Sequence, residues 1–248
     1  MPRKLLSLKR IGVFLTLLST PWAALAETDS ESDNWNFGIG TSFFALNVEG
    51  DVGINTQLGP SVTKLDLDFD DVNNAMDSAA GIAGFAQKGD WKINYAVGRL
   101  KLEGETGPRR LSFTTSTLDI NLEHPLSVTG LSIYAGLRYT DHEIDFKGPA
   151  INRTLDEDWV DAYVGLAFVM ALAPDITWST RVDVGGGGSD GSATFNTGLN
   201  WAFAPQWVAT FYGKYYTVEY ENGSKGDSDW YLYDNDEFGL GLGITYLW

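Results

Sequence analysis

The chain ends with the stretch F-G-L-G-L-G-I-T-Y-L-W, residues 238–248, in which large apolar residues alternate with glycine or threonine. Successive side chains of a β-strand point to opposite faces, so this stretch predicts a strand with one apolar face and one nearly bare face. The apolar face carries Phe238, Leu240, Leu242, Ile244, Tyr246 and Trp248, and the other carries Gly239, Gly241, Gly243 and Thr245. A strand of a soluble β-sandwich can show this alternation. A strand whose apolar face meets lipid and whose small residues line a narrow lumen explains both faces at once.

The first 26 residues have the organisation of a secretory signal peptide. The basic residues Arg3, Lys4, Lys9 and Arg10 precede an apolar core over residues 11–18, and Ala24-Leu25-Ala26 forms a cleavage site. An amino-terminal membrane anchor is the alternative, but the apolar run is shorter than the roughly 20 residues that a spanning helix needs. The sequence therefore predicts export, with a leader over residues 1–26 and one domain over residues 27–248.

Composition narrows the function classes of that domain. Without the leader, 13 Lys and Arg residues face 33 Asp and Glu residues, and such acidity argues against nucleic acid as a partner. The chain has no cysteine, so disulfides contribute nothing to its stability. It has 28 glycines, 9 Trp, 11 Tyr and 13 Phe, and its alternating runs show no long helical periodicity, which predicts an all-β fold.

Alternating runs predict ten strands, separated by two kinds of connection. The strands are expected near residues 35–46, 80–88, 91–102, 112–124, 129–144, 158–171, 176–186, 192–203, 207–220 and 236–248. Tight turns with Pro or Gly are expected at residues 88–90, 124–130, 173–175 and 204–206, and longer polar connections at residues 47–79, 103–111, 145–157, 187–191 and 221–235. This alternation of short and long connections is typical of outer-membrane barrels, whose turns are periplasmic and whose long loops are extracellular. We predict an antiparallel up-and-down transmembrane β-barrel of ten strands, with eight strands as the alternative.

The predicted strands divide into two faces. In one of them the apolar face carries Val160, Ala162, Val164, Leu166, Phe168 and Met170, opposite Asp161, Tyr163, Gly165 and Ala167. A soluble, ligand-enclosing barrel would turn the apolar face inward, and the alternation alone permits both arrangements. Three features favour an outward apolar face: aromatic residues near strand ends, a polar face rich in Gly, Ser, Thr and Asn, and the scarcity of Lys and Glu on that polar face. The aromatic residues assigned to these girdles are Trp35, Trp91, Trp159, Trp201, Trp207, Tyr246 and Trp248.

A glycine-rich tract, V-D-V-G-G-G-G-S-D at residues 182–190, precedes a strand with Asn200-Trp201 and the stretch Y-G-K-Y-Y-T-V-E-Y at residues 212–220. This pattern resembles the opacity-type and OmpA-like small outer-membrane β-barrel proteins of Gram-negative bacteria, over most of the chain that follows the leader. Gly187 stands where that family usually has an aromatic residue, and Lys214 where it usually has Arg. The resemblance implies a barrel in the outer membrane, and it implies no defined activity.

The last strand also resembles the β-signal that the outer-membrane assembly machinery recognises. Gly243, Tyr246 and Trp248 match this signal, whereas Gly241 stands where a larger polar residue is usual. The resemblance implies the assembly machinery as a partner during biogenesis. It also implies outer-membrane lipids and lipopolysaccharide as surroundings of the folded barrel.

Charged residues on the inward face are the first candidates for a functional site. Alternation places nine of them in the lumen: Lys92, Asp119, Glu123, Arg138, Asp161, Arg181, Asp183, Lys214 and Glu237. Charges in a confined space should pair, because an unpaired buried charge is costly. We expect Arg138, Arg181 and Lys214 to pair with Asp119, Asp161 and Asp183 and to fill the narrow barrel. A gated polar path, opened when these pairs exchange, is the alternative.

Other motifs give weaker indications. His142, flanked by Asp141 and Glu143, could be oriented as a general base, but a surface position in an acidic loop is the expected reading, and His124 falls in a periplasmic turn. The run Gly185–Gly188 lacks the Lys-Ser/Thr of a phosphate loop and predicts a flexible extracellular turn. Carboxylates at residues 66–71, 156–158 and 227–236 could collect Ca²⁺ or Mg²⁺, but their spacing matches no calcium loop. Residues 69–78 can form a short amphipathic helix.

The sequence therefore predicts a non-enzymatic outer-membrane barrel with a structural or surface-interaction role and a largely plugged lumen. No cofactor, metal or catalytic residue is expected, and any surface ligand is unspecified. A passive porin for small solutes is the nearest alternative. A hydrolase at the barrel rim, acting on lipid or peptide, is the distant one.

Overall fold

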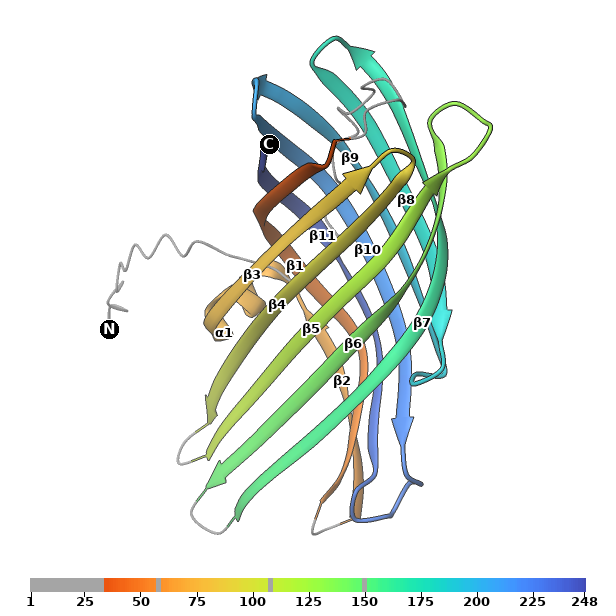
Figure 1. The fold of residues 1–248 in the computed structure, drawn as a ribbon. Coiled ribbons are helices and arrows are strands. Elements are labelled where there is room, and N and C mark those ends of the chain that lie inside the picture. The colour runs from red at the N-terminus through yellow and green to blue at the C-terminus, as the bar shows by residue number, and fades with distance from the viewer. Residues whose placement is uncertain (1–33, 57–58, 107–108, 149–150) are drawn as a thin grey trace, which may run out of the picture.

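The computed structural model describes residues 34–56, 59–106, 109–148 and 151–248, and the leader predicted over residues 1–26 lies outside them. The described residues form eleven strands and one short helix (Figure 1). In chain order these are β1 (Asn36–Thr56), β2 (Gly59–Leu67), α1 (Phe69–Ala75), β3 (Met76–Lys88), β4 (Trp91–Thr106), β5 (Arg109–Pro125), β6 (Leu131–Gly148), β7 (Ile151–Ala173), β8 (Ile176–Gly186), β9 (Gly191–Ala204), β10 (Trp207–Asn222) and β11 (Tyr231–Leu247). Among the described residues, no helix is long and apolar enough to cross a membrane.

Main-chain pairing closes the sheet into a barrel. Strands β3 to β11 pair in sequence, and β1 joins the two ends by pairing with both β11 and β3. The β1–β11 ladder is long, running from Gly38 opposite Leu247 to Ile54 opposite Tyr231. The predicted ten-stranded antiparallel barrel is confirmed, and the eight-stranded alternative is wrong.

β2 is an addition to the ten barrel strands. It folds back on β1, with Val48 opposite Leu67 and Thr56 opposite Gly59, and it pairs with no other strand of the described chain. α1 then leads from β2 into β3. The single long loop predicted over residues 47–79 is therefore wrong, since most of it is a β-hairpin, although its predicted helix is present.

Several strands run further than the sequence predicted. Short turns and the carboxy terminus occupy one end of the barrel, which we call the turn end, and long strands project at the opposite end, the far end (Figure 1). At the far end β7 begins at Ile151, so the loop predicted over residues 145–157 is largely strand. β10 ends at Asn222 and β11 begins at Tyr231, so the loop predicted over residues 221–235 is shorter and covers residues 223–230. The loop predicted over residues 103–111 is likewise mostly strand. Polar side chains did not end these strands, because paired neighbours satisfy the backbone while the side chains face water.

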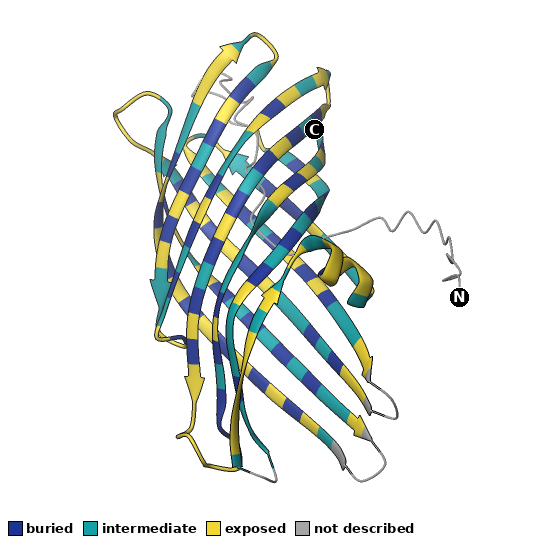
Figure 2. Ribbon diagram, turned by 180° about the vertical axis from the view of Figure 1, so that it is seen from behind, coloured by how far each residue is buried: buried dark blue, intermediate teal, exposed yellow. Residues whose placement is uncertain are grey.

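Exposed apolar side chains cover the outer surface of all ten barrel strands. We call this surface the apolar belt; it includes Ile39, Ile82, Val97, Ile120, Leu137, Val164, Leu166, Val182, Val184, Phe195, Leu199, Phe211 and Leu242. On β7, Val160, Val164 and Leu166 are exposed, whereas Asp161 and Tyr163 are buried. Figure 2 shows the same alternation of buried and exposed positions along the strands. The predicted division into an inward polar face and an outward apolar face is confirmed.

Most of the predicted girdle residues lie on the outer surface. Trp35, Trp91, Trp201, Trp207 and Trp248 are exposed, and all five belong to the turn end of their strands. Trp159 was assigned wrongly, because only 4% of its surface is exposed. It shares the inward face of β7 with Asp161, since side chains two positions apart point the same way.

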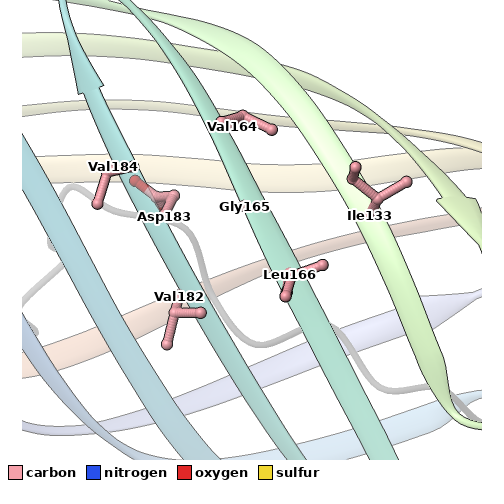
Figure 3. A pocket seen from close by; sticks show the side chains of 7 residues that line it. All are labelled: Ile133, Val164, Gly165, Leu166, Val182, Asp183 and Val184. Atoms are coloured by element: carbon pink, nitrogen blue, oxygen red, sulfur yellow. The ribbon is translucent and has the colours of Figure 1, made fainter.

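A groove of about 270 Å³ lies on the outer surface (Figure 3). Its walls are belt side chains from three neighbouring strands: Ile133 of β6, Val164 and Leu166 of β7, and Val182 and Val184 of β8. Gly165 and Asp183 complete the lining. The groove therefore belongs to the apolar belt and not to the lumen.

Glycine on the inward face makes room for aromatic rings, which gives a first prediction. A Cβ at Gly165 would lie 2.4 Å from the carbonyl oxygen of Val182 and 2.5 Å from the Tyr134 ring. Gly165→Val should lower the free energy of unfolding by about 1–3 kcal/mol through overpacking. Gly104→Val is the control, because a Cβ there meets nothing within 4 Å. Urea unfolding in micelles, followed by tryptophan fluorescence, measures both variants. Equal losses would contradict the inward placement of Gly165.

Candidate functional site in the closed lumen

Arg138 of β6 lies at the centre of a charged layer on the β5–β8 side of the lumen, and its guanidinium lies 5.1 Å from the ring centroid of Tyr216 on β10. Its Nε donates to Asp119 Oδ2 of β5 at 3.2 Å, and its Nη2 donates to Asp183 Oδ1 of β8 at 3.2 Å. Two tyrosines complete the layer: Tyr163 donates to Asp119 at 2.5 Å, and Tyr134 donates to Asp183 at 3.0 Å. Arg138 is only 3% exposed, so these bonds replace the water that its guanidinium would otherwise hold.

Arg181 of β8 forms a second charged group with residues of β4 and β5. Its Nη1 donates to Glu123 Oε2 at 2.6 Å, and its Nη2 donates to Asn121 Oδ1 at 3.3 Å. The guanidinium also lies over the Tyr134 ring, 3.9 Å from the ring centroid. Lys92 lies over the Phe85 ring at 4.8 Å. Arg181 thus pairs with Glu123, and not with one of the three aspartates that the sequence suggested, because Glu123 is within its reach across the lumen.

The remaining predicted lumen charges do not pair as expected. Lys214 Nζ lies 5.0 Å from the Tyr216 ring centroid and forms no hydrogen bond within the described part of the chain. Glu237 accepts a hydrogen bond from the Tyr233 hydroxyl at 3.1 Å. The structure thus brings five of the nine charges into direct ion pairs, and Lys92, Lys214, Glu237 and Asp161 take other partners.

Asp161 does not pair with a cation; its carboxylate binds the β8–β9 turn. It accepts hydrogen bonds from the backbone N of Ser189 at 2.8 Å and from the Ser189 hydroxyl at 2.7 Å. The N–H of Asp190 donates to the carbonyl of Glu219 on β10 at 2.8 Å. The β8–β9 turn is therefore tied to both β7 and β10. The turn predicted at Gly185–Gly188 is present between β8 and β9, and its flexibility stays a prediction.

An apolar cluster fills the lumen at the far end, and the sequence analysis missed it. We call it the outer aromatic cluster; its buried members are Ile144, Leu155, Trp159, Tyr216, Val218, Tyr220, Tyr231 and Tyr233. Trp159 of β7 stacks on Tyr220 of β10 at a centroid distance of 4.2 Å. A signal was present, because alternation from Lys214 places Tyr216, Val218 and Tyr220 on the inward face.

Polar contacts close the mouth beyond this cluster. Glu157 of β7 accepts hydrogen bonds from Tyr220 at 3.1 Å and from Asn222 at 2.9 Å, both on β10. Arg153 of β7 donates to the carbonyl of Asn55 and to the carbonyl of Ser228, each at 2.6 Å. The far end of β7 therefore reaches across to β1, to β10 and to the β10–β11 connection.

His142 lies inside the outer aromatic cluster and not on an acidic surface. Its ring meets those of Phe113, Trp159 and Tyr233 at centroid distances of 4.9, 4.8 and 4.6 Å. Its Nδ1 is 2.9 Å from the Tyr231 hydroxyl. Asp141 and Glu143, its neighbours in sequence, occupy the opposite face of β6 beyond the apolar belt. Among the described residues, no three His, Asp or Glu side chains gather as metal ligands.

No protein-family model matches the chain, and no curated protein matches it. Solved structures do match. The outer-membrane protease OmpT from Escherichia coli has a TM-score of 0.55 and 13% identity, covering 94% of this chain and 99% of that one. The chain has the fold of an outer-membrane β-barrel. The Ail protein of Yersinia pestis has a TM-score of 0.37 at 11% identity, over 86% of this chain and 98% of that one. Neisserial surface protein A has a TM-score of 0.35 at 8% identity, over 86% of this chain and 96% of that one.

The pair of Arg181 and Glu123 gives a stability prediction. Arg181→Met should lower the free energy of unfolding by about 3–5 kcal/mol, because it leaves the buried Glu123 without the guanidinium that pairs with it. The double variant Arg181→Met with Glu123→Leu removes both charges and should recover most of this loss. Urea unfolding measures both. A double variant as unstable as the single one would contradict the pairing.

His142 gives a pH prediction. Burial among the rings lowers the pKa of His142 to about 3. The unfolded chain binds a proton on this imidazole below about pH 6.5, whereas the folded chain does not, so stability should fall as the pH decreases from 6.5 towards 3. The loss approaches about 1.4 kcal/mol per pH unit. His142→Phe should reduce this slope in urea unfolding between pH 6.5 and 5, with His124→Phe as the matched control. An unchanged slope in His142→Phe would contradict the buried, neutral imidazole.

Proposed function

We propose that this protein is an outer-membrane barrel with a closed lumen, which acts through its structure or its surface and not through transport or catalysis. The observation that carries the proposal is the double obstruction of the lumen. The Arg138 layer places buried ion pairs of β5, β6 and β8 in it, and the Arg138 guanidinium extends to the Tyr216 ring of β10, 5.1 Å from its centroid. The outer aromatic cluster fills the lumen at the far end. A solvated pore would instead keep its charges along the wall, in contact with water.

Several observations support a place in the outer membrane. The apolar belt encircles the barrel, and exposed tryptophans lie at the turn end, as expected at a membrane interface. The leader predicted over residues 1–26 and the fold of the barrel agree with this location. In that orientation the turn end is periplasmic, the far end is extracellular, and outer-membrane lipids and lipopolysaccharide surround the belt. Membership of the opacity-type family is part of the same proposal.

The carboxy terminus supports recognition by the assembly machinery. Trp248 exchanges two backbone hydrogen bonds with Phe37, at 2.9 and 3.1 Å, and its ring stacks on Phe37 at 5.7 Å. Tyr246 stacks on Trp248 at 5.8 Å, and Gly243 lies opposite Ser42 of β1. The proposed β-signal residues therefore lie in the part of the last strand that pairs with the first strand at the turn end.

The environment of His142 supports a non-enzymatic role. A general base needs access to the proton that it removes. Here rings surround the imidazole, and one of its two nitrogens is engaged by Tyr231. A rim hydrolase would also need a nucleophile or a bound metal beside this histidine, and the sequence supplies no such motif.

Single-channel recording in planar bilayers tests the closed lumen. The wild-type protein should show conductance near background. Arg138→Ala alone, and Trp159→Ala with Tyr220→Ala, should each stay near background, because each leaves the other obstruction in place. The three substitutions together should conduct. The matched control combines Arg138→Ala with alanine at Trp201 and Phe203, an aromatic pair on the outer surface, and it should stay near background. Robust wild-type channels would overturn the proposal in favour of a passive porin.

Lipid contact of the belt gives a second test. Leu166 and Val62 are both 43% exposed, but Leu166 belongs to the belt and Val62 to the far-end hairpin β1–β2. In phospholipid vesicles Leu166→Arg should cost about 2–4 kcal/mol in unfolding free energy, since a charge near the bilayer midplane loses its hydration. Val62→Arg should cost little. Similar losses at the two sites would argue against a lipid-facing belt.

A further inference from the structure

The ladder on one side of β1 is interrupted. β1 pairs with β3 only over Asn36–Gly40 and with β2 only over Val48–Thr56. β3 meanwhile follows β4 from Met76 opposite Leu102 to Lys88 opposite Trp91. The Thr41 hydroxyl still donates to the carbonyl of Gly81 at 3.1 Å, and beyond this bond β1 and β3 separate until β1 pairs with β2. We call this interval of the wall, bordered by residues 42–47 and 76–80, the seam.

α1 covers the seam. The N–H of Phe69 donates to Asn47 Oδ1 at 3.0 Å, and the Phe69 ring meets the edge of Phe43, an outward residue of β1, at 6.0 Å. Val72 points into the barrel and is 2% exposed. Figure 1 shows the helix standing beside the wall next to β3 and β4. α1 thus rests on the outer side of the wall and inserts one side chain through it.

The lumen behind α1 is apolar. Val72 packs with Phe44, Leu46 and Val48 of β1, Leu100 of β4 and Tyr212 of β10, and we call these six residues the seam cluster. Partly buried Leu65, Leu67, Met76, Ala79 and Leu102 surround them. The Arg138 layer and the Arg181 pair lie elsewhere in the lumen, on β5, β6 and β8. The inner wall is therefore apolar where the ladder is interrupted.

Apolar surface borders the seam on the outside where it faces the belt, whereas the ion pair of Lys101 with Asp77 lies at its far-end border. Ile82 of β3 is 51% exposed and Val97 of β4 is 46% exposed, and both belong to the apolar belt. Phe43 continues this surface on β1. The belt and the seam cluster would form one apolar surface across the wall if α1 moved away.

α1 is a short helix with one deeply buried side chain. It has only seven residues, too few for a helix that is stable by itself. Asp70, Asp71, Asn73 and Asn74 are exposed, and Val72 is its one buried side chain. Its amino terminus is capped by Asp68, whose side chain accepts from the N–H of Asp71 at 2.9 Å.

We propose that the seam is a lateral binding site for the hydrocarbon chain of a lipid in the surrounding bilayer, and that α1 moves aside to admit it. The chain would lie on Phe44, Leu46 and Val48 in the place of Val72. The chemistry of the site selects this occupant, because the seam cluster has no charged side chain and the seam opens onto the apolar belt. The inference rests on the proposed membrane location.

Photolabelling in vesicles tests this site. The refolded protein is placed in phosphatidylcholine vesicles that contain a phospholipid with a diazirine in its acyl chain, and labelled residues are mapped by mass spectrometry. Wild-type protein should be labelled at Phe44, Leu46 or Leu100 as well as on the belt. Val72→Asp places a carboxylate in the seam cluster and should displace α1, raising this inner labelling several-fold. Asn73→Asp, on the exposed face of α1, should leave it at the wild-type level.

A variant in which α1 cannot move away from β1 gives the opposite test. The chain has no cysteine, so Phe43→Cys with Phe69→Cys introduces the only two thiols, one on β1 and one on α1, and their disulfide, verified by mass spectrometry, fastens the helix. Oxidation should abolish inner labelling, and reductant should restore it. The proposal is overturned if neither wild-type nor Val72→Asp protein is labelled at the seam cluster, or if inner labelling persists in the oxidised form. Labelling of Leu166 in the same samples reports insertion, so a failure of the membrane location itself is recognised separately.

Discussion

The pairing of β1 with β11 is the constraint on which the rest of this structure depends. It joins the first strand of the sheet to the last, so the described backbone closes into a barrel that is interrupted only at the seam, and each strand residue faces either inward or outward. A closed ladder also satisfies the main-chain hydrogen bonds without water, which a barrel surrounded by lipid requires. Phe37 and Trp248 complete this pairing at the turn end with two reciprocal hydrogen bonds. The aromatic terminal residue thus contributes to closure as well as to the outer surface.

Within this ladder the polarity of the two faces reverses along single strands. On β7, Asp158 is outward and Trp159 inward, whereas two residues later Val160 is outward and Asp161 inward. On β10, Lys214 is inward beside outward Tyr215, and then Tyr216, Val218 and Tyr220 are inward between outward Thr217 and Glu219. The barrel is apolar outside and polar inside at the belt, and polar outside and apolar inside at the far end. The far half therefore has the organisation of a soluble β-sandwich core, because its outer face meets water.

This reversal explains how the barrel is closed with different chemistry at different heights. At the belt the lumen holds charges, and they are stabilised by pairing and by tyrosine hydroxyls around Arg138 and Arg181. At the far end the strands can approach across the lumen, so Trp159 stacks on Tyr220 and Arg153 bonds to Asn55 and Ser228. The seam is an interruption in the wall, where α1 covers a stretch in which β1 and β3 are not paired.

The sequence by itself predicted the class of fold, the ten barrel strands and the face of most residues, but it did not predict β2. These follow from period-2 alternation, as in the stretch from Phe238 to Trp248, which depends only on local backbone geometry. It also determined which charges lie in the lumen. Tertiary structure decided their partners: Arg181 meets Glu123 and Asp161 meets Ser189, because reach across a barrel depends on register and tilt. It also decided that His142 is buried and that α1 covers a gap in the wall, since both depend on which distant strands converge and which separate.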